Sequence, residues 1–184
     1  MSTGKYAGYA DDALKPFAEK LLNEYYSSVE VLCNNAKGQA EKVNSLETET
    51  TASEYAQLCC NIIDDLGQHV EGRKKRFIPY VHELVERTVD NHDCSSCTGN
   101  CKLGHEMQVT ELNESNNLAK KILHRLQLAT LPLYSQTMFP DEYRILRNRM
   151  ALMEINMTEL FFLENTYLIP KIIAAQKTIN AGHN

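Results

Sequence analysis

The sequence lacks the features that mark several large classes of protein. No apolar run approaches the ~20 residues that a membrane-spanning helix needs. The first six residues do not supply the apolar core of a signal peptide, so we expect a cytoplasmic protein. The net charge of −5 gives no electrostatic basis for binding nucleic acid. Neither a membrane nor a nucleic acid is therefore expected as a partner.

Recognisable catalytic motifs are also missing. The chain has no Gly-x-Ser-x-Gly, no phosphate-binding glycine loop and no Glu-x-x-His pair of the carboxylate-bridged bundles. A weaker alternative is an enzyme that uses Glu164 and His69 as an acid–base pair. The absence of a complete catalytic constellation favours binding over catalysis.

Helical periodicity runs through almost all of the 184 residues, and no segment alternates as a strand would. Apolar residues recur at spacings of three and four and predict four helices, over 11–35, 53–91, 104–130 and 141–178. Residues 1–10 are expected to be flexible, and 36–51 to form a polar loop. The fold expected is all-α: a single domain over 1–184, built as a four-helix up-down antiparallel bundle with a cysteine-rich loop between helices two and three.

That loop holds three of the six cysteines. Cys94, Cys97 and Cys101 lie between His92 and His105. The first two cysteines can bind one metal from a tight turn, whereas Cys101 and His105 would lie on one face of a helix. Thiolates with an imidazole suit zinc or an iron–sulfur cluster, so we predict a site with His92 or His105 as the fourth ligand. A disulfide or redox thiols, or a polar loop with unligated thiols, are the alternatives.

Polar residues also fall on the inward faces of the predicted helices. His69 lies in or beside the apolar stripe of the second helix, with Asp65 and Arg73 one turn away on either side. Glu164 lies in the stripe of the fourth. A buried carboxylate needs a partner. We therefore predict a hydrogen bond or ion pair from Glu164 to His69 or Arg73, or a metal between them. A second pair, His82 and Glu86, is expected to make an exposed contact or, alternatively, to bind a metal.

Two stretches of the sequence echo each other, 69–79 and 160–170, and each ends in an apolar residue followed by Ile-Pro. This resembles the hemerythrin-like, cation-binding four-helix bundles, whose second and fourth helices end in a similar pattern. Glu164 matches the first glutamate of the family. Leu160 and Phe161 stand where the family has histidines, and Arg73 replaces an acid. The resemblance implies a bundle with a degenerate di-iron site and iron in its core.

Together these features predict a cytoplasmic metal- or iron–sulfur-binding bundle with a redox or sensing role. The alternative is a non-enzymatic structural or interaction protein in which the cysteine-rich loop is a zinc staple. A homo-oligomer and a protein partner are both compatible with the sequence.

Overall fold

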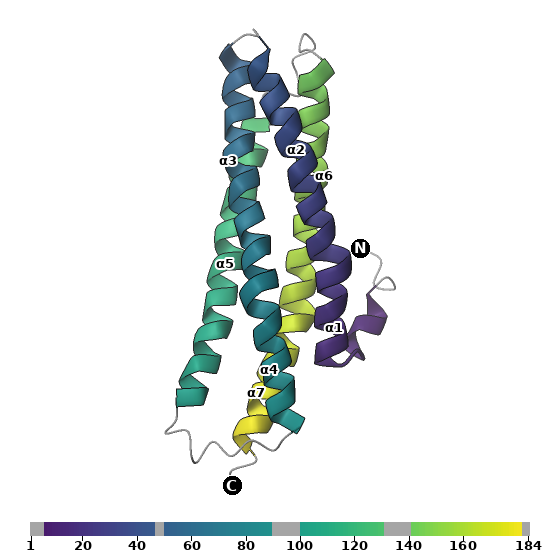
Figure 1. Cartoon of the computed structure of the whole chain (residues 1–184), viewed down its shortest axis with the longest axis vertical. Coiled ribbons are helices and arrows are strands. Elements are labelled where there is room, and N and C mark those ends of the chain that lie inside the picture. Colours follow the sequence, from purple (N-terminus) through teal and green to yellow (C-terminus); the bar gives the residue numbers. More distant parts are fainter. Residues whose placement is uncertain (1–5, 47–49, 90–99, 131–140, 182–184) are drawn as a thin grey trace.

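A computed structural model of the chain describes residues 6–46, 50–89, 100–130 and 141–181. All regular structure in these ranges is helical, and no strand occurs in them. Four long helical segments lie side by side along the longest axis of the molecule (Figure 1). The predicted all-α class and the four helices are therefore confirmed.

The first long segment is longer than the sequence predicted. Its parts are α1 (Leu14–Lys20), η2 (Leu21–Tyr26) and α2 (Ser27–Ser45). The prediction of a loop from residue 36 was wrong, because Ala36, Ala40 and Val43 continue the buried stripe at helical spacing. Alanine is the best helix former, and Gly38 is tolerated inside this helix at a cost of ~1 kcal/mol.

The other three segments follow the predicted order, with shifted ends. The second consists of α3 (Thr50–Gly72), η3 (Arg73–Phe77) and α4 (Ile78–Val89). The third is α5 (Asn100–Thr130), which begins four residues before the predicted 104. The fourth consists of α6 (Asp141–Leu163), η6 (Glu164–Leu168) and α7 (Ile169–Ala181).

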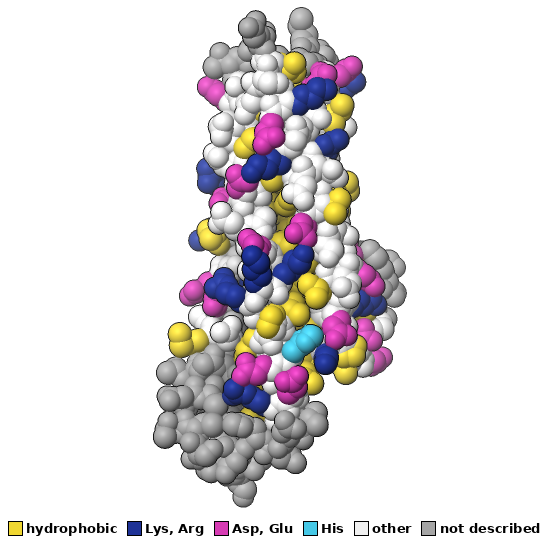
Figure 2. Space-filling view, in the orientation of Figure 1, with side chains coloured by type: hydrophobic (Ala, Val, Ile, Leu, Met, Phe, Trp, Pro, Cys, Tyr) yellow, Lys and Arg dark blue, Asp and Glu magenta, His cyan; other side chains and the backbone are white. Residues whose placement is uncertain are grey.

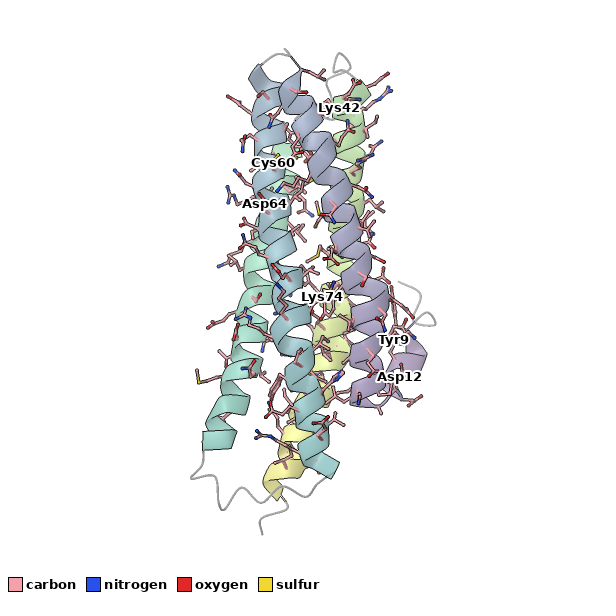
Figure 3. The ribbon with its side chains drawn as sticks, in the orientation of Figure 1. Tyr9, Asp12, Lys42, Cys60, Asp64 and Lys74 are labelled. Atoms are coloured by element: carbon pink, nitrogen blue, oxygen red, sulfur yellow. The ribbon has the colours of Figure 1, made fainter. Side chains whose placement is uncertain are left out.

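The predicted flexible start is in part an ordered aromatic cluster. Residues 1–5 lie outside the described ranges, but Ala7–Ala10 form a 3-10 helix, η1. The Tyr9 ring lies 5.6 Å from that of Phe17 and 6.2 Å from that of Tyr167. Figure 3 labels Tyr9 beside the first segment. Aromatic packing thus anchors the chain from residue 6 onward, which corrects the expectation for 6–10.

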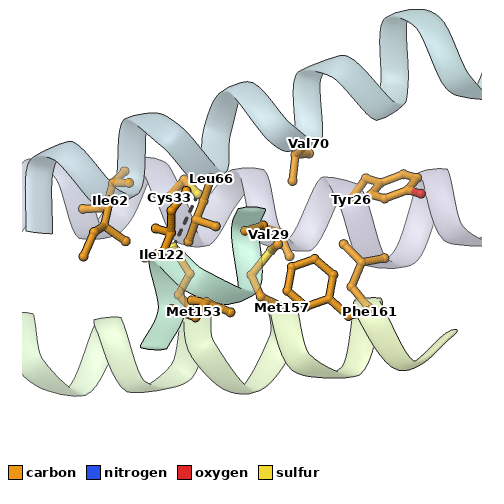
Figure 4. Close-up of a cluster of buried hydrophobic side chains, with 14 of the residues drawn as sticks. Tyr26, Val29, Cys33, Ile62, Leu66, Val70, Ile122, Met153, Met157 and Phe161 are labelled. Carbon is orange, nitrogen blue, oxygen red and sulfur yellow. Dashed lines mark hydrogen bonds between the residues drawn. The ribbon is translucent and has the colours of Figure 1, made fainter. Parts of the chain in front are cut away.

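The core is formed where the four segments face one another. α2 packs against α3 and α6, α3 against α5, and α4 against α7. Figure 4 shows side chains from the first, second and fourth segments, with Ile122 of α5, converging in one apolar cluster. Within it the Cys33 thiol lies 3.5 Å from the sulfur of Met153. The methionine stripe of α6 is core packing, as expected from its spacing.

The surface carries mixed charge. Figure 2 shows acidic and basic side chains interspersed along the visible face, with scattered apolar groups between them. Exposed ion pairs join α2 to the second segment, from Lys37 to Asp64 at 2.7 Å and from Glu30 to Lys74 at 2.6 Å. No helix in the described part of the chain is long and apolar enough to cross a membrane.

Candidate functional site

Three stretches of π-helix interrupt the long segments. They are η2, η3 and η6. η3 ends two residues before Pro79, and η6 ends two residues before Pro170. A proline cannot donate to the carbonyl four residues earlier, and its ring would press on that carbonyl. The wider π turn takes up this interruption inside a continuous helix.

Each π-helical stretch supplies one residue to a buried polar cluster. Tyr26 is the last residue of η2, Arg73 the first of η3 and Glu164 the first of η6. All three are buried, and Glu164 is 0% exposed. The three interruptions of the helices therefore coincide with three residues of one buried polar cluster. Because π-bulges are often found at functional sites, we take this cluster as a candidate site.

The carboxylate of Glu164 is held from two sides. The Tyr26 hydroxyl donates to Oε1 at 2.6 Å, and Arg73 Nε donates to the same oxygen at 3.2 Å. The predicted pairing of Glu164 with Arg73 is therefore present. Burial, and next the neighbouring Glu164 carboxylate, raise the pKa of the Tyr26 hydroxyl well above its usual value, so it remains a donor.

The third helical segment closes the cluster from the other side. Arg73 Nη2 donates to the side-chain oxygen of Asn116 at 2.8 Å and to the backbone oxygen of Leu112 at 3.2 Å. The guanidinium thus links the second segment to α5 and to η6. A buried charge pair is tolerated only when such additional hydrogen bonds satisfy it.

His69 lies one helical turn before Arg73 and has a different partner from the one expected. Its Nδ1 lies 2.9 Å from the Ser115 hydroxyl, and its ring packs edge-on against Phe161. Asp65, the predicted carboxylate partner, is exposed. Burial and then the charge of Arg73 lower the pKa of His69 to about 3, so the ring is neutral at pH 7. His69 and Glu164 share no hydrogen bond, which leaves the acid–base alternative without its contact.

The interior does not fit the di-iron site that the family resemblance implies. Among the described residues, no three His, Cys, Asp or Glu side chains come together. The buried positions Leu160 and Phe161 are apolar, and Arg73 already balances the charge of Glu164 through Oε1, while Oε2 is buried without a hydrogen-bond partner in the described chain. The residues present fit an ion pair, because Arg73 supplies the positive charge that balances the Glu164 carboxylate.

The cysteine-rich segment can be followed only in part. His92, Cys94 and Cys97 lie outside the described residues, as do the side chains of Cys101 and His105. The backbone of Cys101 and His105 belongs to α5, although the predicted helix over 104–130 did not include Cys101. The metal site itself remains a prediction.

The other titratable candidates are ordinary structural groups. Cys33 and Cys59 are buried, and burial raises their thiol pKa values to about 11 and about 12. His82 Nε2 lies 4.0 Å from a carboxylate oxygen of Glu19, so its nearest acidic contact comes from α1. None of these groups forms part of a three-ligand site within the described chain.

Comparison with known protein families and with curated proteins gives no match.

Proposed function

We propose that this protein is a cytoplasmic up-down antiparallel bundle that binds zinc or an iron–sulfur cluster through its cysteine-rich segment. Its role is sensing or redox response, by binding and without catalysis of its own. One observation carries the proposal: α5 begins at Asn100. The i, i+4 spacing of Cys101 and His105 within one helix supports binding of a common metal. Cys94 and Cys97 supply the other thiolates.

The same helix supports a sensing role because it leads directly to the buried cluster. Leu112 and Asn116, which accept from Arg73, lie on α5. Leu112 follows His105 by about 10 Å of helix at 1.5 Å per residue. A metal that orders the start of α5 would therefore bias the position of the Arg73 partners. In this scheme the signal is the loss or oxidation of the bound metal. The structural response is a shift of Leu112 and Asn116 relative to Arg73 in the buried polar cluster.

The second candidate is an interaction protein in which zinc only staples α4 to α5. Exposed apolar side chains favour it, since Leu118 is 61% and Ile155 64% exposed. Such residues could contact a protein partner or a second copy of the chain. In this candidate the metal stabilises the fold and does not report a signal.

Metal analysis of protein purified without air tests the proposal. We expect metal bound at a defined stoichiometry and lost in the Cys94→Ser/Cys97→Ser variant. The matched control is Cys60→Ser, which removes a thiol from α3. Visible absorption that bleaches on exposure to air supports the cluster and the sensing role, whereas colourless zinc supports the staple. Metal-free protein that also fails to bind added zinc or iron would overturn both.

A further inference from the structure

A groove of 390 Å³ runs along the surface between the second helical segment and α5. His69 and Arg73 line it on one side, and Ser115, Ile122 and Arg125 line it on the other. Its volume falls in the range of ~300–1,000 Å³ that holds small molecules in proteins. Arg73 belongs both to the groove and to the buried cluster, whereas Glu164 does not line the groove.

One of the three guanidinium nitrogens of Arg73 makes no hydrogen bond within the described chain. Its Nε and Nη2 donate to Glu164, Leu112 and Asn116 in the interior. Within the described chain, Nη1 has no hydrogen-bond partner, although Arg73 is only 5% exposed. A guanidinium held rigidly on one edge and unpaired on the other is preorganised for an anionic oxygen.

His69 adds a second unpaired group to the same groove. Its Nε2 is buried and lacks a hydrogen-bond partner in the described part of the molecule. The ring is neutral, so when Nδ1 accepts from the Ser115 hydroxyl, Nε2 carries the proton and can donate. Arg73 and the His69 ring therefore both line the groove, although Nε2–H itself is buried and not exposed to it in this structure.

The remaining lining defines what kind of molecule would fit. Arg125 stands at the rim without an ion-pair partner among the described residues, and Arg76 is paired with Glu111 at 2.9 Å. Leu118, Ala119 and Ile122 form a short apolar stretch on the α5 side, between Ser115 and Arg125. The lining also includes the exposed carboxylate of Asp65, so that Arg73 and Arg125, one acid and a short apolar stretch of α5 together suit a single carboxylate attached to a short apolar body.

We propose that this groove binds a small organic carboxylate. Its carboxylate is received by Arg73 Nη1 beside the His69 ring, and its apolar part lies along Leu118, Ala119 and Ile122 of α5. The inference does not depend on metal binding, because every residue named lies outside the cysteine-rich segment.

Butyrate is the test probe, with butyramide as its neutral counterpart of similar shape and inorganic phosphate as a bare anion. Titrations follow the ring signals of His69, assigned with a His69→Gln variant, by nuclear magnetic resonance. We expect a saturable shift with butyrate, no shift with butyramide, and weaker binding of phosphate, which lacks the apolar part. Equal response to all three probes, or no saturation with butyrate up to tens of millimolar, would overturn the proposal.

Two exposed variants of α5 separate this site from general attraction of anions. Arg125→Gln removes the rim cation and is expected to weaken butyrate binding about five-fold, which corresponds to ~1 kcal/mol. Lys121→Gln removes an equal charge from a position that does not line the groove. It should leave the affinity unchanged. Equal weakening in both variants would show a nonspecific electrostatic effect and would also overturn the proposal.

Discussion

Arg73 and Glu164 are paired at equivalent positions of two echoing helical segments. Nε of Arg73 donates to Oε1 of Glu164 at 3.2 Å, and each residue is the first of a π-helical stretch. Each also stands six residues before a proline, Pro79 or Pro170. The repeated sequence pattern is therefore a repeated backbone feature, and the two copies meet at a buried ion pair.

The first prediction concerns Glu164→Gln. The change removes the negative charge but keeps the shape of the side chain, so the Arg73 charge remains buried without compensation. We expect a loss of ~3–5 kcal/mol in the free energy of unfolding, measured by urea denaturation. Asp64→Asn is the control, because it breaks the exposed pair with Lys37 and should cost no more than ~1 kcal/mol. Equal effects of the two changes would contradict a stabilising role of the buried pair.

The second prediction is that removing both charges is less harmful than removing one. In Arg73→Met/Glu164→Leu neither desolvated charge remains, and apolar groups fill the space. Urea denaturation should find this double variant more stable than Glu164→Gln. A double variant less stable than the single one would mean that the contacts of Arg73 to α5 matter more than charge balance.

The third prediction concerns Tyr26, whose hydroxyl donates to Glu164 at 2.6 Å. Tyr26→Phe leaves the carboxylate with one donor fewer, and a lost hydrogen bond to a buried charged group costs ~1–3 kcal/mol. In the Arg73→Met/Glu164→Leu background the same change should cost less, because the acceptor is gone. A double-mutant cycle measures this coupling. Identical costs in both backgrounds would refute it.

The four helices, and the need of Glu164 for a buried partner, could be predicted from the sequence because both depend on local pattern. Apolar spacing placed four helices, and Glu164 stood in an apolar stripe that required a partner. The candidate partners were His69 and Arg73, which lie one turn apart in the matching echo, or a metal between them and Glu164. Which of the candidates contacts Glu164 depends on how the second and fourth segments are rotated and shifted relative to each other. The spacing of residues along one helix does not determine that arrangement.

Tyr26 was missed for a specific physical reason. A regular helix predicts Leu22, Tyr25 and Val29 on the buried face. The π turn of η2 adds a residue, so the stripe passes from Leu21 to Tyr26. No proline marks this turn in the sequence, unlike the two later ones. The role of Ser115 was missed similarly, because its contact with His69 joins two different segments.

The last prediction is that His69 makes the protein less stable in weak acid. Its pKa is about 3 in the folded state and near the ordinary 6.5 once unfolded. Between these values the unfolded chain binds one proton more than the folded chain. The free energy of unfolding therefore falls as the pH decreases below about 6.5, by up to ~1.4 kcal/mol per pH unit. Above pH 6.5 the residue is neutral in both states and contributes no slope.

Urea denaturation of the wild type and of His69→Gln, between pH 7 and pH 4, measures this prediction. The difference between the two proteins separates the contribution of His69 to the pH dependence of stability from the contribution of the carboxylates. Glutamine can still bond to Ser115 but does not titrate, so the variant should lose less stability over the same range. His124→Gln, which changes an exposed histidine of α5, should retain the slope of the wild type. Parallel curves for the wild type and His69→Gln would mean that the ring takes up a proton in the folded protein as readily as in the unfolded chain. Its burial against Phe161 would then not hold it neutral.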